Sequence, residues 1–157
     1  MLLKPSEIFY SQHHISTTFG KSTDHRFQDI GSALDDLING KLSVTSFPQI
    51  KVTKRPGENK WYTISNRRLW IFHHYEAYLR GRGETLKIEV DVVEYCFSFI
   101  RYFNSTNGGT SVTYFRNRNP GGIYWQIITP VVPKYVEPEQ QEQHLDALTR
   151  ACASLAL

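Results

Sequence analysis

Cysteine is scarce in this 157-residue chain, which holds only Cys96 and Cys152. The two lie far apart and match no Cys-x-x-Cys spacing, so the sequence supports neither a disulfide framework nor a zinc knuckle. We expect both to be buried thiols in a reducing compartment. No stretch of about 18 apolar residues exists, which excludes a transmembrane helix. Residues 1–6 also lack the apolar core of a secretory signal, so we expect a cytoplasmic protein with no membrane partner.

Positive charge is concentrated in the body of the chain. Residues 1–136 hold 17 Lys or Arg against 11 Asp or Glu, a balance of +6, whereas residues 137–157 hold one Arg against four acids, a balance of −3. A basic body fits a polyanionic ligand such as a nucleotide or a nucleic acid, although many ordinary domains reach this charge. The length suits one domain over residues 1–136, followed by the acidic tail.

The acidic tail over residues 137–157 is predicted to form an amphipathic helix. Its apolar side chains at Leu145, Leu148, Cys152 and Leu155 share one helical face after a proline-containing stretch. We expect this helix to pack on the body or on a protein partner, and a partly frayed terminus is the alternative.

The spacing of apolar residues predicts an α+β domain in which helices and strands are interleaved. Helices are predicted over 29–39, over 66–79 and, as a short aromatic helix, over 94–104. Strands are predicted at 7–10, 50–53, 61–64, 88–92, 111–115 and 123–129. The strands at 50–53 and 61–64 flank a turn containing Pro56-Gly57 and should pair as a hairpin. Trp61, Trp70 and Trp125 fall inside these elements, where we expect them in the core.

Arg67 and Arg68 are the most informative residues of the sequence. They follow Ser65 and Asn66, both good N-cap residues, so they fall in the first turn of the predicted helix. A helix N-terminus carries partial positive charge and free N–H groups, and it favours an anion over a cation. Two arginines are tolerated there most easily when a phosphate or carboxylate binds the N–H groups and both guanidinium groups. Alternatively, they pair with distant acidic residues or point into water.

The order of these elements resembles the ParB/sulfiredoxin-like superfamily. In that family a strand and a tight turn lead into a helix whose Gly-Glu-Arg-Arg type box grips nucleotide phosphates. Here residues 64–69, Ile-Ser-Asn-Arg-Arg-Leu, match the box, and residues 48–52, Pro-Gln-Ile-Lys-Val, match the family's Pro-Ile-x-Val strand. Residues 9–15 and 103–112 are most similar to ParB-like domains at the ends of bacterial polymorphic toxins. The resemblance implies a small ParB/sulfiredoxin-like mixed sheet with flanking helices.

The same resemblance implies a set of site residues. The phosphate-binding candidates are Ser11, Ser65, Asn66, Arg67 and Arg68, and the catalytic candidates beside them are Gln12, His13 and His14. The chain departs from the family at Ser65-Asn66, which stands where the partitioning proteins carry Gly-Glu. It also has no counterpart of sulfiredoxin's phosphate-loop cysteine beside Arg67. These departures argue against a CTP-dependent switch and against sulfinic-acid repair.

Two function classes remain open. The first is a hydrolase of phosphoesters or phosphoanhydrides, such as a nuclease, a nucleotide phosphohydrolase or a toxin effector domain, in which Gln12 or a histidine positions the nucleophile. The second is a non-catalytic module that binds a nucleotide or a nucleic-acid backbone, for which the arginines suffice. The enzyme is the interpretation we favour.

The remaining polar clusters have both a chemical and a structural interpretation. Glu89, Asp91 and Glu94 are candidates to hold Mg²⁺ beside a bound polyphosphate, but such a row is more often the solvated face of a strand. No metal-binding motif is recognised otherwise. His73 and His74 lie two turns beyond the arginines, and we expect a surface or half-buried structural role for them.

Overall fold

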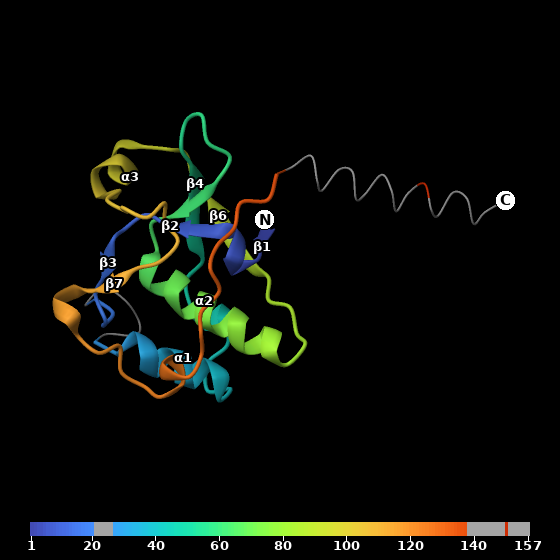
Figure 1. Ribbon diagram of the computed structural model, residues 1–157, viewed down its shortest axis with the longest axis vertical. Helices are drawn as coiled ribbons and strands as arrows, with labels where there is room; N and C mark the ends of the chain where they lie inside the picture. The colour runs from blue at the N-terminus through green and yellow to red at the C-terminus, as the bar shows by residue number, and fades with distance from the viewer. Residues whose placement is uncertain (21–26, 138–149, 151–157) are drawn as a thin grey trace.

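The computed structural model, which describes residues 1–20, 27–137 and 150, is built on a curled mixed sheet of five strands (Figure 1). The strands lie side by side in the order β1 (Leu2–Leu3), β6 (Ile88–Val92), β4 (Ile50–Lys54), β5 (Trp61–Thr63) and β2 (Ile8–Tyr10). The β4–β5 pair is the antiparallel hairpin predicted from the sequence, whereas β6 pairs with β4, and β5 with β2, in parallel. A separate parallel pair joins β3 (His14–Ile15) to β7 (Thr113–Tyr114). The predicted α+β class is confirmed.

Three α-helices occupy the positions predicted for them. They are α1 (Ile30–Ile38), α2 (Asn66–Gly81) and α3 (Phe97–Tyr102). Short 3₁₀ helices lie at Pro5–Glu7, Val44–Ser46, Phe115–Asn117 and Tyr124–Gln126. Gly40, whose φ is +78°, follows α1, a backbone angle that favours glycine and ends the helix. No helix of the described residues is long and apolar enough to cross a membrane.

Helix α2 is the centre of the molecule and is enclosed on every side of its middle turns. Its six consecutive residues 69–74 are all buried, because α1 packs against it and the strand β2 lies beside it. The extended segment 131–134 crosses the helix as well: Val131 N–H donates to the carbonyl of His73, and Lys134 N–H donates to the carbonyl of Ser6. His73 and His74 are therefore fully buried, and the expectation of a surface or half-buried position for them was wrong.

The sheet has apolar side chains packed on both of its faces at the β2–β5 edge. Strand side chains alternate, so Ile8 and Tyr10 point into the main core with α1 and α2. Phe9 and Tyr62 point the other way and pack with Phe99 of α3 in a second, smaller cluster. The edge strand β2 is thereby held between two layers, which fixes the direction of the chain that leaves it at Ser11.

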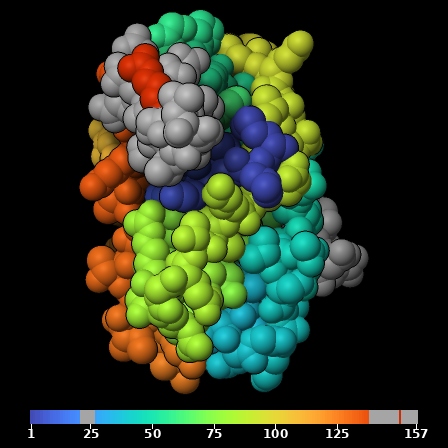
Figure 2. All heavy atoms as spheres, turned by 90° about the vertical axis from the view of Figure 1, so that its right-hand side faces the viewer, coloured from blue at the N-terminus to red at the C-terminus, as the bar shows by residue number. Residues whose placement is uncertain are grey.

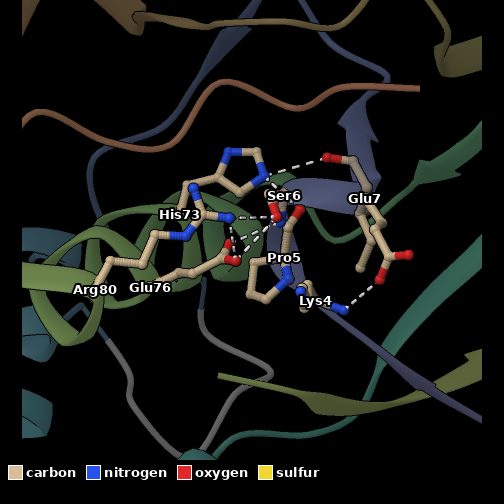
Figure 3. A network of polar contacts seen from close by, with 8 residues as sticks. Lys4, Pro5, Ser6, Glu7, His73, Glu76 and Arg80 are labelled. Carbon is tan, nitrogen blue, oxygen red and sulfur yellow. Dashed lines mark hydrogen bonds and ion pairs between the residues drawn. The ribbon is translucent and has the colours of Figure 1, made fainter. Parts of the chain in front are cut away.

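A partly buried polar network fastens the N-terminal 3₁₀ helix to α2 (Figure 3). The Glu76 carboxylate accepts from the Ser6 N–H at 2.7 Å, from the Ser6 hydroxyl at 2.9 Å and from Arg80 Nη2 at 3.0 Å. The His73 Nε2 lies 2.9 Å from the carbonyl oxygen of Pro5 and 3.1 Å from that of Ile8. Since both partners are acceptors, the nitrogen carries the proton and donates.

Some predictions from the sequence need correction, and others fall outside the described residues. Residues 123–129 are not a strand, because the Asp35 carboxylate accepts from Ile123 N–H at 2.8 Å and from Tyr124 N–H at 3.0 Å and so holds a 3₁₀ turn there. Cys96 is exposed rather than buried, since it precedes α3 at the surface. Trp70 is in the core, and Trp61 and Trp125 pack against it partly buried. Cys152 and the predicted helix at 137–157 lie outside the described residues apart from positions 137 and 150.

Replacing Gly31 with alanine should destabilise the fold strongly, although it adds only one methyl group. A Cβ at this position would lie 1.8 Å from the carbonyl oxygen of Gly121, and Gly31 N–H donates to the carbonyl of Pro120 at 2.8 Å. The loop must move away, so we expect a loss of about 1–3 kcal/mol in the free energy of unfolding. Gly81→Ala, which meets no atom within 4 Å in the last turn of α2, is the matched control and should stabilise by about 0.5–1 kcal/mol. Equal denaturation midpoints for the two variants would contradict this packing.

Candidate functional site

A cavity of about 460 Å³ opens in front of the first turn of α2. Its described lining comes from four parts of the chain: the segment after β2, the turn into α2, and single residues near α3 and β7. The lining residues are Gln12, His14, Ser16, Phe19, Ile64, Ser65, Asn66, Arg67, Arg68, Asn104 and Phe115. No carboxylate is among them, so the charged groups of the described wall are cationic.

Both arginines of the box face this cavity, and each is held by backbone carbonyl groups. Arg67 Nη1 donates to the carbonyl of Thr18 at 2.6 Å, and Arg68 Nη1 donates to those of Pro48 and Gln49 at 2.6 and 3.0 Å. Neither forms an ion pair with a carboxylate of the described residues. The alternative that they pair with distant acidic residues therefore finds no support within the described part of the chain.

Both guanidinium groups of the box are partly desolvated, and they repel each other. Burial lowers the pKa of Arg67, and burial together with repulsion from Arg67 lowers the pKa of Arg68. Arginine nevertheless stays charged at neutral pH, because its ordinary pKa is far higher. Within the described residues these two partly desolvated positive charges have only neutral acceptors, so an anion that enters the cavity would stabilise them.

The end of the helix adds to this positive potential. The Ser65 side chain makes no capping hydrogen bond, and its hydroxyl instead accepts from Arg68 Nη2 at 3.1 Å. The first intrahelical bond runs from Leu69 N–H to the carbonyl of Ser65 at 3.0 Å. The N–H groups of residues 66–68 precede that bond, and no hydrogen bond joins them to an acceptor among the described residues. This geometry suits a tetrahedral oxyanion such as phosphate.

Ser11 and Asn66 are hydrogen-bonded to each other, and of the two only Asn66 lines the cavity. The Asn66 side-chain oxygen accepts from Ser11 N–H at 2.9 Å, and its amide nitrogen donates to the Ser11 hydroxyl at 3.0 Å. Both residues are buried, and Ser11 is not part of the cavity wall. They position the site by clamping the end of β2 to the start of α2, which places Gln12 at the cavity.

Two of the three catalytic candidates line the cavity, and the third does not. Gln12 and His14 line the cavity, and the exposed His14 ring packs against Phe115 with centroids 5.6 Å apart. His13 does not line it: its Nδ1 lies 3.0 Å from the Thr106 hydroxyl, and its N–H donates to Asn104 Oδ1 at 2.7 Å. The structure thus brings two of the three candidates to the arginines.

Several lining residues escaped the sequence analysis. Asn104 and Phe115 reach the cavity from the far end of the domain because β7 pairs with β3 in parallel, with Thr113 opposite His14. The resemblance expected from the sequence at residues 103–112 pointed to this region, and it stays a prediction. Nothing in the local sequence marks Phe19, which faces Arg67 with the guanidinium carbon 5.9 Å from its ring centre.

The carboxylates considered for Mg²⁺ lie elsewhere. Glu89 and Asp91 are on β6, and the Glu89 carboxylate pairs with the amino group of Met1. No group of three His, Cys, Asp or Glu side chains among the described residues is arranged to hold a metal ion. A requirement for Mg²⁺ stays a prediction.

Comparisons of the chain with family models, with curated proteins and with solved structures found no match.

Proposed function

We propose that the chain is a ParB/sulfiredoxin-like domain that binds the phosphate of a nucleotide or nucleic acid and hydrolyses a phosphoester or phosphoanhydride bond. The observation that carries this proposal is the cavity at the start of α2, where Arg67 and Arg68 meet the helix N-terminus without a described carboxylate. The strand, hairpin and helix order around the Asn-Arg-Arg box supports the family assignment. The resemblance expected from the sequence at residues 9–15 and 103–112 is its other support.

The proposed roles follow from where each group lies. Arg67, Arg68 and the free N–H groups of α2 hold the phosphate and stabilise the charge that develops on its oxygens in the transition state. Gln12 orients the attacking water, and the His14 imidazole accepts its proton. His13 takes no direct part in the proposed chemistry, because it does not line the cavity and its Nδ1 lies 3.0 Å from the Thr106 hydroxyl. Mg²⁺ is the candidate cofactor.

The second candidate function is a non-catalytic module that binds a nucleotide or a nucleic-acid backbone. It is favoured by the small number of acid–base groups at the cavity, where His14 is the one titratable residue of the described lining besides the arginines. A binding module needs the arginines and the helix terminus alone. A protein partner for the predicted tail is compatible with either function.

Replacing His14 with asparagine separates the two functions. Asparagine keeps a polar side chain of similar length but accepts no proton, so an enzyme should lose about 10²–10⁴-fold in turnover while phosphate affinity changes little. The measurement is release of labelled product from nucleotides and short oligonucleotides, with and without Mg²⁺, beside a thermal-shift titration with the same compounds.

His13→Asn is the matched control for the His14 variant, because the two histidines are neighbours and only His14 lines the cavity. It should retain most of the turnover. If wild-type protein binds these compounds without turning any of them over, the binding module is the correct function.

A further inference from the structure

A second basic surface lies away from the arginine cavity, where the β4–β5 hairpin meets the start of β2. Lys54 is directly opposite Trp61 across the hairpin, and its ammonium nitrogen is 4.5 Å from the centre of that ring. The ammonium nitrogen of Lys60 is 4.9 Å from the centre of the Phe9 ring. These four residues line a groove of about 230 Å³, which we call the lysine groove.

The opposite side of the lysine groove is formed by residues 134–136. Lys134 N–H donates to the carbonyl of Ser6, which places this segment along the N-terminal 3₁₀ helix. Asn59 Nδ2 donates to the Tyr135 hydroxyl at 3.3 Å and so bridges the hairpin turn to the segment. Figure 2 shows the N-terminal residues on this side of the molecule, between the hairpin above and the C-terminal end of α2 below. The groove is therefore built from three parts of the chain.

The described lining of the lysine groove carries a net positive charge. Lys54, Lys60 and Lys134 all line it, and none of them forms an ion pair with a carboxylate of the described residues. Glu7 is the one carboxylate in the described lining, and its Oε2 accepts from the backbone N–H of Lys4 at 2.7 Å. The Lys54 ammonium also donates to the side-chain oxygen of Asn59. The ring contacts and this bond hold the ammonium groups in place before any ligand arrives.

We propose that the lysine groove binds single-stranded nucleic acid. Positive side chains that follow a groove, interleaved with aromatic rings, are the combination by which proteins hold a single strand: cations contact phosphates and a base stacks on a ring. Trp61 is the half-buried ring at the rim that offers this stacking surface. The bases of a duplex are already stacked on one another and do not reach the Trp61 ring. An acidic peptide would pair with the lysines but has no base to stack on that ring.

The lysine groove also narrows the substrate of the proposed hydrolase. Its described lining shares no residue with that of the arginine cavity, so the two are separate sites, and we infer that one ligand reaches both only if it is a chain of several nucleotides. The substrate class is then a polynucleotide rather than a free nucleotide. This last step rests on the proposed function, whereas the groove's affinity for a single strand does not.

Charge-matched triple variants of the full chain test the groove. The ligand is a fluorescein-labelled oligothymidylate of about 12 nucleotides, followed by fluorescence anisotropy over a range of salt concentrations. Lys54→Gln, Lys60→Gln, Lys134→Gln should bind at least about 10-fold more weakly, and the slope of log affinity against log salt should fall by about 2, since each phosphate contact contributes about 0.7. The control, Lys41→Gln, Lys51→Gln, Lys87→Gln, removes the same charge from exposed lysines outside the groove and should change affinity less than about 2-fold.

Trp61→Phe supplies a readout that depends on the ring itself. Phenylalanine still stacks a base, so affinity should stay close to wild type, but quenching of tryptophan fluorescence on oligothymidylate binding should be lost. Equal weakening in the two triple variants, unchanged quenching in Trp61→Phe, or duplex DNA bound as tightly as the single strand would each overturn the proposal.

The outcomes distinguish this proposal from the proposed function. If inorganic phosphate binds at the arginine cavity but the affinity for oligothymidylate does not depend on the groove lysines, the groove proposal fails and the phosphate site stands. If oligothymidylate binding depends on the groove lysines while inorganic phosphate binds nowhere, the groove stands and the phosphate site fails.

Discussion

Alanine at both Arg67 and Arg68 should remove phosphate binding, with a loss of at least about 100-fold in affinity. A hydrogen bond to a charged group contributes about 1.5–3 kcal/mol, and the double variant removes one such cation from each side of the bound anion. Arg68→Lys should weaken binding as well, although it keeps the charge. Arg68 donates through two nitrogens to three acceptors, and a single ammonium group cannot reproduce that geometry.

The control for the arginine variants is Arg82→Ala combined with Arg101→Ala. Both residues are exposed, and neither lines the cavity, so the net charge changes equally while the site stays intact. Isothermal titration with phosphate and with nucleotides measures the affinities, and melting curves show that each variant is folded. Equal affinity in the two double variants would show that general charge, and not the box, attracts the anion.

Acid should destabilise the protein steeply between pH 6.5 and about 4 because of His73 and His74. Burial lowers the pKa of each imidazole to about 4, against the partial opposition of hydrogen bonds to carbonyl oxygens of Pro5, Ile8 and Trp70. The unfolded chain therefore takes up protons first as the pH falls, so the stability present above pH 6.5 is lost on the way to pH 4. At 1.36 kcal/mol per pKa unit, each histidine costs about 3 kcal/mol over this range.

Urea unfolding at a series of pH values checks the prediction for the buried histidines. His74→Gln should flatten the decline by about half, and the double variant with His73→Gln should flatten it further. His13→Asn, which changes a less buried histidine, controls for the loss of an imidazole as such. An imidazole of His73 or His74 that titrates near pH 6.5 in the folded protein, followed by NMR, would contradict this account.

The helices and strands that the sequence located correctly are those marked by a clear pattern in neighbouring residues. Helix α1 has apolar residues at helical spacing and ends before Gly40, and the β4–β5 hairpin joins two alternating strands through a turn with Pro56-Gly57. The segment 123–129 was misassigned because a distant carboxylate, Asp35, takes its N–H groups. Pairings between distant strands, such as β2 with β5, carry no local signal, since each strand is only three residues long.

The location of the cavity was predicted from residues whose charge is unfavourable at their position in the helix. Two arginines in the first turn of a helix conflict with the helix dipole, and the cavity lies exactly at that turn. By contrast, the sequence did not reveal that Ser11 and Asn66 bond to each other, because both are ordinary polar residues far apart in the chain. The burial of His73 was missed for the related reason that a strap from residues 131–134 covers α2.

Backbone amide NMR with inorganic phosphate tests the central claim most directly. In ¹⁵N-labelled protein, the site predicts saturable shifts of the amide signals of Arg67, Arg68 and Leu69 and of the arginine Nε signals, at the first turn of α2. These shifts should be absent in the Arg67→Ala, Arg68→Ala variant and retained in the lysine-groove triple variant. Shifts confined to other parts of the chain, or none at concentrations that saturate binding, would contradict a phosphate site at this helix.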